Sequence, residues 1–319
     1  METPFNLASL AREYSDESAA RLKFEEMRWG KGCVNVTCPH CAVIGLDNSY
    51  RVKVGPGSST RPGLWRCRSC KGQFTVTKGT VFEDSHVPLT KWLLALYLLA
   101  ASKKGMSAHQ IHRMLKVKYQ TAWFMMHRLR YAMSVGPLAD KLRGVIEMDE
   151  TFLGGKKKGK NGRSPSDRRK AMVVALVERG GRARAFPMAM VTSADIRKAI
   201  IKHVDPLQSE LMTDESKVYG GDKLGRIPHF SVAHWQGEYV RGRVHTNTIE
   251  GFWSLFKRGI VGTFHHIGTE HLDKYADEFA FRYSSRHVSD GTRAEQIFKN
   301  GEGKRLTYKQ PADSGTATA

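Results

Sequence analysis

Two Cys-x-x-Cys pairs, Cys38/Cys41 and Cys67/Cys70, are the feature that most limits how this chain can fold. Each pair can form a turn in which both sulfurs face one cation, and two such turns complete the tetrahedral S₄ shell of a structural Zn²⁺. The 25 residues between the pairs (67 − 41 − 1) slightly exceed the usual spacing, and the Gly/Pro-rich stretch 55–63 accommodates the excess. Four unrelated thiols are the alternative that this doubled spacing disfavours. We therefore predict a zinc ribbon.

Charge indicates the kind of partner. The 319 residues include 51 Lys plus Arg against 31 Asp plus Glu, a formal net charge of +20. Such an excess favours a polyanion, nucleic acid first and an anionic membrane second, over a merely basic soluble protein. The longest apolar stretch, 92–101, is too short to cross a bilayer, and no secretory leader opens the chain. We expect a cytoplasmic, nucleoid-associated protein without a membrane partner, in which an odd number of cysteines favours metal over disulfides.

Hydrophobic periodicity divides the chain into five segments. These are a helical lead-in over 1–30, the zinc ribbon over 31–84, a helical segment over 85–135, a domain of alternating strands and helices over 140–290, and a polar tail over 300–319 that is expected to be disordered.

The helical segment has the spacing of a helix-turn-helix. Ser107 is a candidate N-cap for a helix that ends at Leu115, and a turn over 116–119 leads to a helix over 120–131. If the last helix enters the major groove of DNA, the side chains available to contact bases are Tyr119, Gln120, Thr121, His127 and Arg128. The alternative is a helix pair that binds nothing, with Trp123, Phe124, Met126 and Leu129 as core residues.

Two aspartates follow apolar strands. Asp149 comes after the predicted strand 145–148, and Asp214 comes after the predicted strand 211–213. Adjacent strands would place both carboxylates at one edge of a sheet, where only cations relieve their repulsion. Hard cations such as Mg²⁺ prefer oxygen ligands, and a pair of them can activate a nucleophile and stabilise a leaving oxygen. The flanking carboxylates Glu147, Glu150 and Glu215 are expected to point elsewhere.

A third carboxylate lies on a predicted helix over 246–259. Glu250 follows Asp214 after 35 intervening residues (250 − 214 − 1), and Lys257 lies on the same side of the helix seven positions later, where it could hold a phosphate. Asn247-x-x-Glu250 is also a capping-box arrangement, in which Glu250 would only tie down the helix start. Asn247 could then be a neutral metal ligand, and both alternatives stay open.

A basic run lies close to Asp149 in the sequence. It contains Lys156, Lys157, Lys158, Lys160, Arg163, Arg168, Arg169 and Lys170, interleaved with Gly and Ser. A flexible loop of this kind would neutralise several phosphates and make binding sensitive to salt. The alternative is a solvated hairpin tip.

Several of these motifs together resemble one family. The stretch 245–260, HTNTIEGFWSLFKRGI, followed by His265-His266, resembles the C-terminal catalytic signature of DDE transposases of bacterial insertion sequences. The specific resemblance is to the ISXO2-like group, which has an N-terminal zinc ribbon. The stretch 148–155 resembles its first catalytic strand, 213–215 its second, and 67–82 its ribbon.

This resemblance implies an α/β fold: a ribonuclease-H-like mixed sheet with flanking helices, after the ribbon and the helical segment. It implies Mg²⁺ or Mn²⁺ as cofactor, with Asp149, Asp214 and either Glu250 or Asn247 as ligands, and Lys257 at the family's following basic position. The implied substrates are terminal inverted repeats and target double-stranded DNA, bound by at least a homodimer. Two rival interpretations are a non-catalytic DNA-binding protein and a metal-dependent nuclease without strand transfer.

Overall fold

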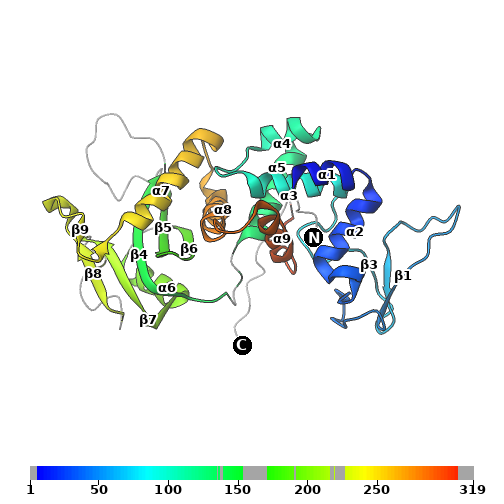
Figure 1. Ribbon diagram of the computed structural model, residues 1–319, viewed down its shortest axis with the longest axis horizontal. Helices are drawn as coiled ribbons and strands as arrows, with labels where there is room; N and C mark the ends of the chain where they lie inside the picture. The colour runs from blue at the N-terminus through cyan, green and yellow to red at the C-terminus, as the bar shows by residue number, and fades with distance from the viewer. Residues whose placement is uncertain are drawn as a thin grey trace. The chain divides into compact units, whose positions relative to one another are not determined.

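The computed structural model describes residues 6–134, 136, 139–153, 171–189, 192–215, 219 and 227–307 (Figure 1). They form two compact units. The ribbon unit contains the described residues up to Met133 together with those from Val288 onward, and the sheet unit spans Ser134–His287.

The ribbon unit combines a small antiparallel sheet with helices. Its elements are α1 (Leu7–Glu13), α2 (Glu17–Trp29), β1 (Ser49–Arg51), β2 (Trp65–Cys67), β3 (Gln73–Phe74), α3 (Leu89–Ala101), α4 (Ala108–Leu115), α5 (Tyr119–Met133) and α9 (Asp290–Asn300). The sheet order is β1-β2-β3.

A buried carboxylate attaches this small sheet to α2. Glu25 is fully buried, accepts a hydrogen bond from Trp65 Nε1 at 3.0 Å and pairs with Arg51. The Trp29 ring packs edge-on against Trp65, with centroids 5.5 Å apart. A buried charge is tolerated only when it is paired and hydrogen-bonded, so β1 and β2 are held in place on α2.

The C-terminal segment belongs to the ribbon unit, which differs from the expected domain boundary near residue 290. Phe298 of α9, a helix that the sequence did not predict, packs against Phe24 and Phe82 with ring centroids 5.0 and 5.4 Å away. The expected disorder of 300–319 also differs from the structure over 301–307, where Glu302 forms a β-bridge with Thr80 and Leu306 is buried. Residues 308–319 lie outside the described part of the chain.

Helices α4 and α5 have the predicted helix-turn-helix arrangement. Ser107 Oγ accepts the Gln110 N–H at 3.2 Å, as an N-cap does, and Lys116 is left-handed at the turn. Tyr119 and Gln120 are exposed at the start of α5, and Thr121 is half-buried.

The prediction that His127 and Arg128 are available to DNA is wrong. Both side chains are buried, and Arg128 Nη1 donates to the Glu83 carbonyl at 2.8 Å. The C-terminal half of α5 is buried almost all round, because it packs among the other helices of the unit.

The sheet unit is built on five strands in the order β6-β5-β4-β7-β8. They are β4 (Leu142–Leu153), β5 (Ala171–Glu178), β6 (Ala183–Met188), β7 (Val204–Asp214) and β8 (His229–Val232). The first three form an antiparallel meander, whereas β7 runs parallel to β4 and β8 parallel to β7. In order of appearance the strands stand 3-2-1-4-5, so the predicted ribonuclease-H-like mixed sheet is confirmed.

Helices cover both faces of this sheet (Figure 1). Alternate residues of β5 point to opposite sides: Val173 packs among α7 (Asn247–Gly259) and α8 (Leu272–Ser284), whereas Val174 packs with α6 (Ser193–His203). This period of two is what a strand buried on both faces requires. Among the helices in the described part of the chain, none combines the length and apolar character needed to cross a bilayer.

We predict that Phe298→Ala destabilises the ribbon unit by about 3–5 kcal/mol, the usual cost of removing a buried aromatic ring. Urea unfolding followed by circular dichroism measures the change, with Lys299→Ala, an exposed neighbour on the same helix, as control. Equal stability of the two variants would contradict the assignment of α9 to this core.

Candidate metal and active sites

The four predicted zinc ligands converge. The sulfurs of Cys38, Cys41, Cys67 and Cys70 lie within 4.8 Å of one another, with Cys38 and Cys70 3.6 Å apart and Cys41 and Cys67 3.7 Å apart. Hydrogen bonding from the Cys70 backbone N–H lowers the pKa of the Cys67 thiol to about 6, whereas burial raises the pKa of the Cys38 thiol to about 12. The convergence of the four sulfurs is therefore what indicates a metal site. The cluster fits a structural Zn²⁺.

Two neighbours of this cluster have other partners. Cys33 is buried and its sulfur lies 3.9 Å from a Glu25 oxygen, outside the cluster. The His40 Nε2 lies 3.2 Å from the Gln73 carbonyl oxygen. The tetrathiolate set is therefore complete without either residue.

Asp149 and Asp214 occupy corresponding positions on adjacent parallel strands. The register of β4 and β7 ends with Glu147 opposite Met212, and each aspartate follows two residues later on its strand. Asp149 lies inside β4, which continues to Leu153, so the expectation that it follows the end of its strand is wrong. Its Oδ2 accepts a hydrogen bond from Trp253 Nε1 of α7 at 3.0 Å. The side chain therefore points toward the α7 face of the sheet.

The electrostatics of Asp149 favour a cation. Burial, the neighbouring carboxylate of Glu150 and the carboxylate of Asp214 raise the pKa of Asp149 from 3.8 to about 6. The carboxylate is thus held in its charged form at neutral pH against an unfavourable field. A bound cation would reverse that field.

Glu250, Asn247 and Lys257 are all exposed on α7. Glu250 Oε1 accepts a hydrogen bond from the Thr246 hydroxyl at 3.3 Å. Thr246, not Asn247, is the N-cap, so the predicted capping box of Asn247 and Glu250 is not formed. Within the described ranges, the four cysteines are the only group of three or more His, Cys, Asp or Glu side chains placed to hold a metal ion, so Asp149, Asp214 and Glu250 do not form such a group.

Glu147 caps α7 from a different part of the fold. It was expected to point away from Asp149, which is wrong because residues two apart on a strand share a face. The Glu147 carboxylate is fully buried, accepts the Ile249 N–H at 2.9 Å and accepts from Arg179 Nε at 2.6 Å. The Ile249 N–H is one of the first N–H groups of a helix, which have no partner within the helix. A carboxylate also suits the positive end of the helix dipole.

The other flanking carboxylates have partners elsewhere. Glu150, on the opposite face of β4 from Asp149, accepts a hydrogen bond from the buried Tyr219 hydroxyl, and the pKa of Tyr219 is raised by burial and by Glu150. Glu215 accepts the backbone N–H of His234 at 2.8 Å. Both residues therefore point elsewhere, as expected.

Comparisons with known proteins decide the family. A family model described as the ISXO2-like transposase domain matches residues 141–284, and one described as the transposase zinc-ribbon domain matches residues 15–73. A protein of the transposable element ISH50 of Halobacterium salinarum is 30% identical over 289 residues, covering 84% of this chain and 90% of its own length. This chain belongs to the ISXO2-like transposase family.

The solved structures that match include one viral assembly. A chain in the cryo-EM structure of the simian T-cell lymphotropic virus intasome with a PP2A regulatory subunit aligns over 70% of the transposase and 78% of its own length. The identity is 12% and the TM-score 0.29, which is too low to establish a shared fold.

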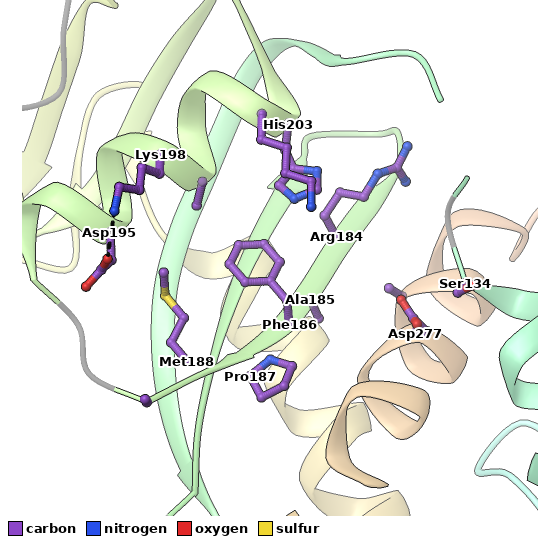
Figure 2. Close-up of a pocket in the computed structure, with 14 residues that line it drawn as sticks. Ser134, Arg184, Ala185, Phe186, Pro187, Met188, Asp195, Lys198, His203 and Asp277 are labelled. Atoms are coloured by element: carbon purple, nitrogen blue, oxygen red, sulfur yellow. Dashed lines mark ion pairs between the residues drawn. The ribbon is translucent and has the colours of Figure 1, made fainter. Parts of the chain in front are cut away.

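One pocket of the sheet unit is not lined by Asp149 or Asp214 (Figure 2). It has a volume of about 600 Å³ and is lined by residues of β6, α6 and α8. Figure 2 shows the stacked rings of Phe186 and His203 in it, near Arg184. Burial and the nearby cations lower the pKa of His203 to about 4, so its ring is neutral at physiological pH. None of the predicted site residues lines this pocket.

The basic run 156–170 lies outside the described residues, so the loop predicted beside Asp149 stays a prediction.

We predict that the purified transposase carries one zinc ion per chain and loses it on Cys67→Ser. Zinc sites of this kind have apparent binding free energies of about 10–16 kcal/mol, as much as the whole stability of a typical domain, so the ribbon should unfold without metal. Elemental analysis and thermal unfolding measure both effects. Cys33→Ser, a buried cysteine outside the cluster, is the matched control and should keep its zinc.

We also predict that Asp149→Asn stabilises the metal-free protein at pH 8. The folded-state pKa is raised, so the wild type loses stability as pH rises from about 4 to 6, and that loss amounts to about 3 kcal/mol above pH 6. Asparagine removes the penalty, so the variant should gain little at pH 4 and most at pH 8. Calorimetry at both pH values, with and without Mg²⁺, tests this. Equal stability of wild type and variant at pH 8 would contradict it.

Proposed function

We propose that this transposase cleaves DNA at the terminal inverted repeats of an insertion sequence and joins the freed 3′-hydroxyl to target DNA. The observation that carries the proposal is the placement of Asp149 and Asp214 at corresponding positions of adjacent parallel strands. Two carboxylates in that relation, in a protein with a net charge of +20, suit cations that bridge protein and phosphate.

The donors fit Mg²⁺ or Mn²⁺. Both aspartates offer hard oxygen ligands, and the raised pKa of Asp149 marks a carboxylate whose charge is uncompensated by the protein alone. When bound, such cations activate the attacking hydroxyl or water and stabilise the leaving oxygen. The chain's own contribution is to orient Asp149 through Trp253 and to hold α7 through Glu147.

Glu250 is the third ligand that we favour over Asn247. Because Glu147 caps α7, Glu250 is not needed for a capping box, and among the described residues its side chain accepts only a long hydrogen bond from Thr246. A third negative charge also balances two divalent cations better than an amide does. Lys257, two helical turns further on the same side, would contact a phosphate of the bound DNA.

DNA binding is supported by membership of the family and by the charge of the chain. In our proposal the exposed Tyr119 and Gln120 of α5 face the duplex, and at least a homodimer holds the two element ends. This activity would associate the protein with the nucleoid.

The test uses purified protein, Mg²⁺ and a labelled duplex that carries the inverted repeats flanking the gene. Wild type should nick the ends and join them to target DNA, whereas Asp149→Ala and Asp214→Ala should lose about 1,000-fold or more in rate, since bound metal supplies several kcal/mol. Glu250→Gln should be as impaired as the aspartate variants, and Asn247→Ala only mildly.

Two other outcomes would overturn the proposed reaction, and a third would overturn only the choice of the third ligand. Nicking without joining would indicate a nuclease. Tight binding of the ends without metal-dependent nicking would indicate a DNA-binding protein that occupies them. A severe loss in Asn247→Ala with full activity in Glu250→Gln would exchange the two residues as third ligand.

A further inference from the structure

A tryptophan is exposed beside the candidate active site. Trp235 lies on η3 (His234–Gln236), a short 3-10 turn after β8, and 74% of its surface is accessible to solvent. Tyr239, four residues later, is 60% exposed. Large aromatic residues are usually mostly buried, so two that stand in water on one short segment indicate a surface that contacts something.

The backbone that carries Trp235 is firmly held. The Glu215 carboxylate accepts the N–H groups of His234 and Trp235 at 2.8 and 3.3 Å, and Glu238 accepts the Ala233 N–H at 3.2 Å. A carboxylate that accepts two backbone N–H groups fixes a turn strongly. The exposure of the ring is therefore a property of a defined turn, as a rigid contact surface requires.

This turn joins the elements that carry the predicted metal ligands. Val232, the last residue of β8, pairs with Asp214, and η3 begins two residues later. On the other side, His234 Nε2 lies 3.4 Å from the Thr246 hydroxyl, which donates to Glu250. The Trp235 turn is therefore attached on one side to the end of β7, where Asp214 lies, and on the other side to the start of α7.

We propose that Trp235, beside His234 whose ring packs against Tyr239 with centroids 5.2 Å apart, is a stacking platform for one unpaired DNA base next to the phosphate that is cut. This inference rests on the proposed function and adds a subsite to it. Indole rings stack on any base, because every base has a π face. A protein that holds a base out of the duplex must offset the cost of unstacking and unpairing it, and a platform already fixed in place does so.

Charge around the turn favours DNA over a protein partner. Arg241 and Arg243, on and just after β9 (Val240–Arg241), pair with Glu238 and Glu210 and still expose more than half of their side chains to solvent. Further along the same unit, Lys257 and Arg258 are exposed in the last turn of α7. An aromatic ring among cations is the arrangement that binds single-stranded nucleic acid, where the backbone is neutralised while a base stacks.

The experiment compares two substrates and four proteins. One duplex carries the fully paired element end, and the other carries two mismatched base pairs at the cleavage site. Equilibrium binding is measured for wild type, Trp235→Ala, Trp235→Phe and Leu207→Ala. Leu207 is 90% exposed near the start of β7, at the other end of the strand from Asp214, and serves as the matched control.

Wild type, Trp235→Phe and Leu207→Ala should all bind the mismatched end more tightly than the paired end. Trp235→Ala should lose roughly 5- to 100-fold of that preference, the factor expected from one lost base–aromatic stack. Nicking of the paired end by Trp235→Ala should fall by a similar factor, and the mismatched end should restore part of it.

The two proposals fail separately. If wild type does not nick either substrate, the proposed cleavage is wrong, and the binding preference still tests the platform. If wild type nicks but Trp235→Ala keeps the full preference for the mismatched end, the platform is overturned and Trp235 belongs to a contact with protein.

Discussion

The candidate active site depends on a carboxylate that is not one of its predicted ligands. Glu147 is fully buried in β4 and receives hydrogen bonds from the Ile249 N–H and from Arg179, which also donates to the His245 carbonyl. This single group joins the central strand to the start of α7. Losing one partner of such a buried pair leaves an unpaired charge, which commonly costs about 3–5 kcal/mol. The bonds of Glu147 therefore hold β4, which carries Asp149, against the start of α7, which carries Glu250.

The charge of Asp149 destabilises the fold at the position where we propose a metal ligand. A strand that packs on α7 would be more stable with an uncharged residue there, because burial and two nearby carboxylates raise the pKa of Asp149 to about 6. The fold tolerates this destabilised group where Trp253 donates a hydrogen bond to it. A carboxylate that the protein itself does not neutralise attracts a cation, which is why this position supports our proposal of a metal site.

The ribbon unit, like the sheet unit with Glu147, has a buried carboxylate that joins a helix to a sheet. Glu25 is buried between α2 and the small sheet and is satisfied by Trp65 and Arg51. The four cysteines can hold the loops of that sheet, and Glu25 fixes the sheet to the helices. Phe298 of α9, near the C-terminal end of the described chain, completes the aromatic core by stacking on Phe82. A module with three very short strands needs all three supports, since such a sheet buries little apolar surface by itself.

Much of this protein could be predicted from local patterns in the sequence. The doubled Cys-x-x-Cys spacing predicted the cysteine cluster, and periodicity located strands and helices of the sheet unit. The stretch 245–260, together with the motifs around Asp149, Asp214 and the cysteines, indicated the family. Local patterns also misled: His127 and Arg128 looked available to DNA and are buried, and Glu147 was assigned to the wrong face.

Contacts between residues far apart in the sequence were decided only by the tertiary structure. Glu147 bonds a residue 102 positions away, and Arg293 of α9 donates to a carbonyl 193 positions away. The exposure of Trp235 likewise depends on which elements surround it. The hydrophobic periodicity of a helix or strand shows only which of its sides is apolar. The burial of a side chain, the capping of a helix and the hydrogen-bond partners of a residue depend on what the rest of the chain packs against that side.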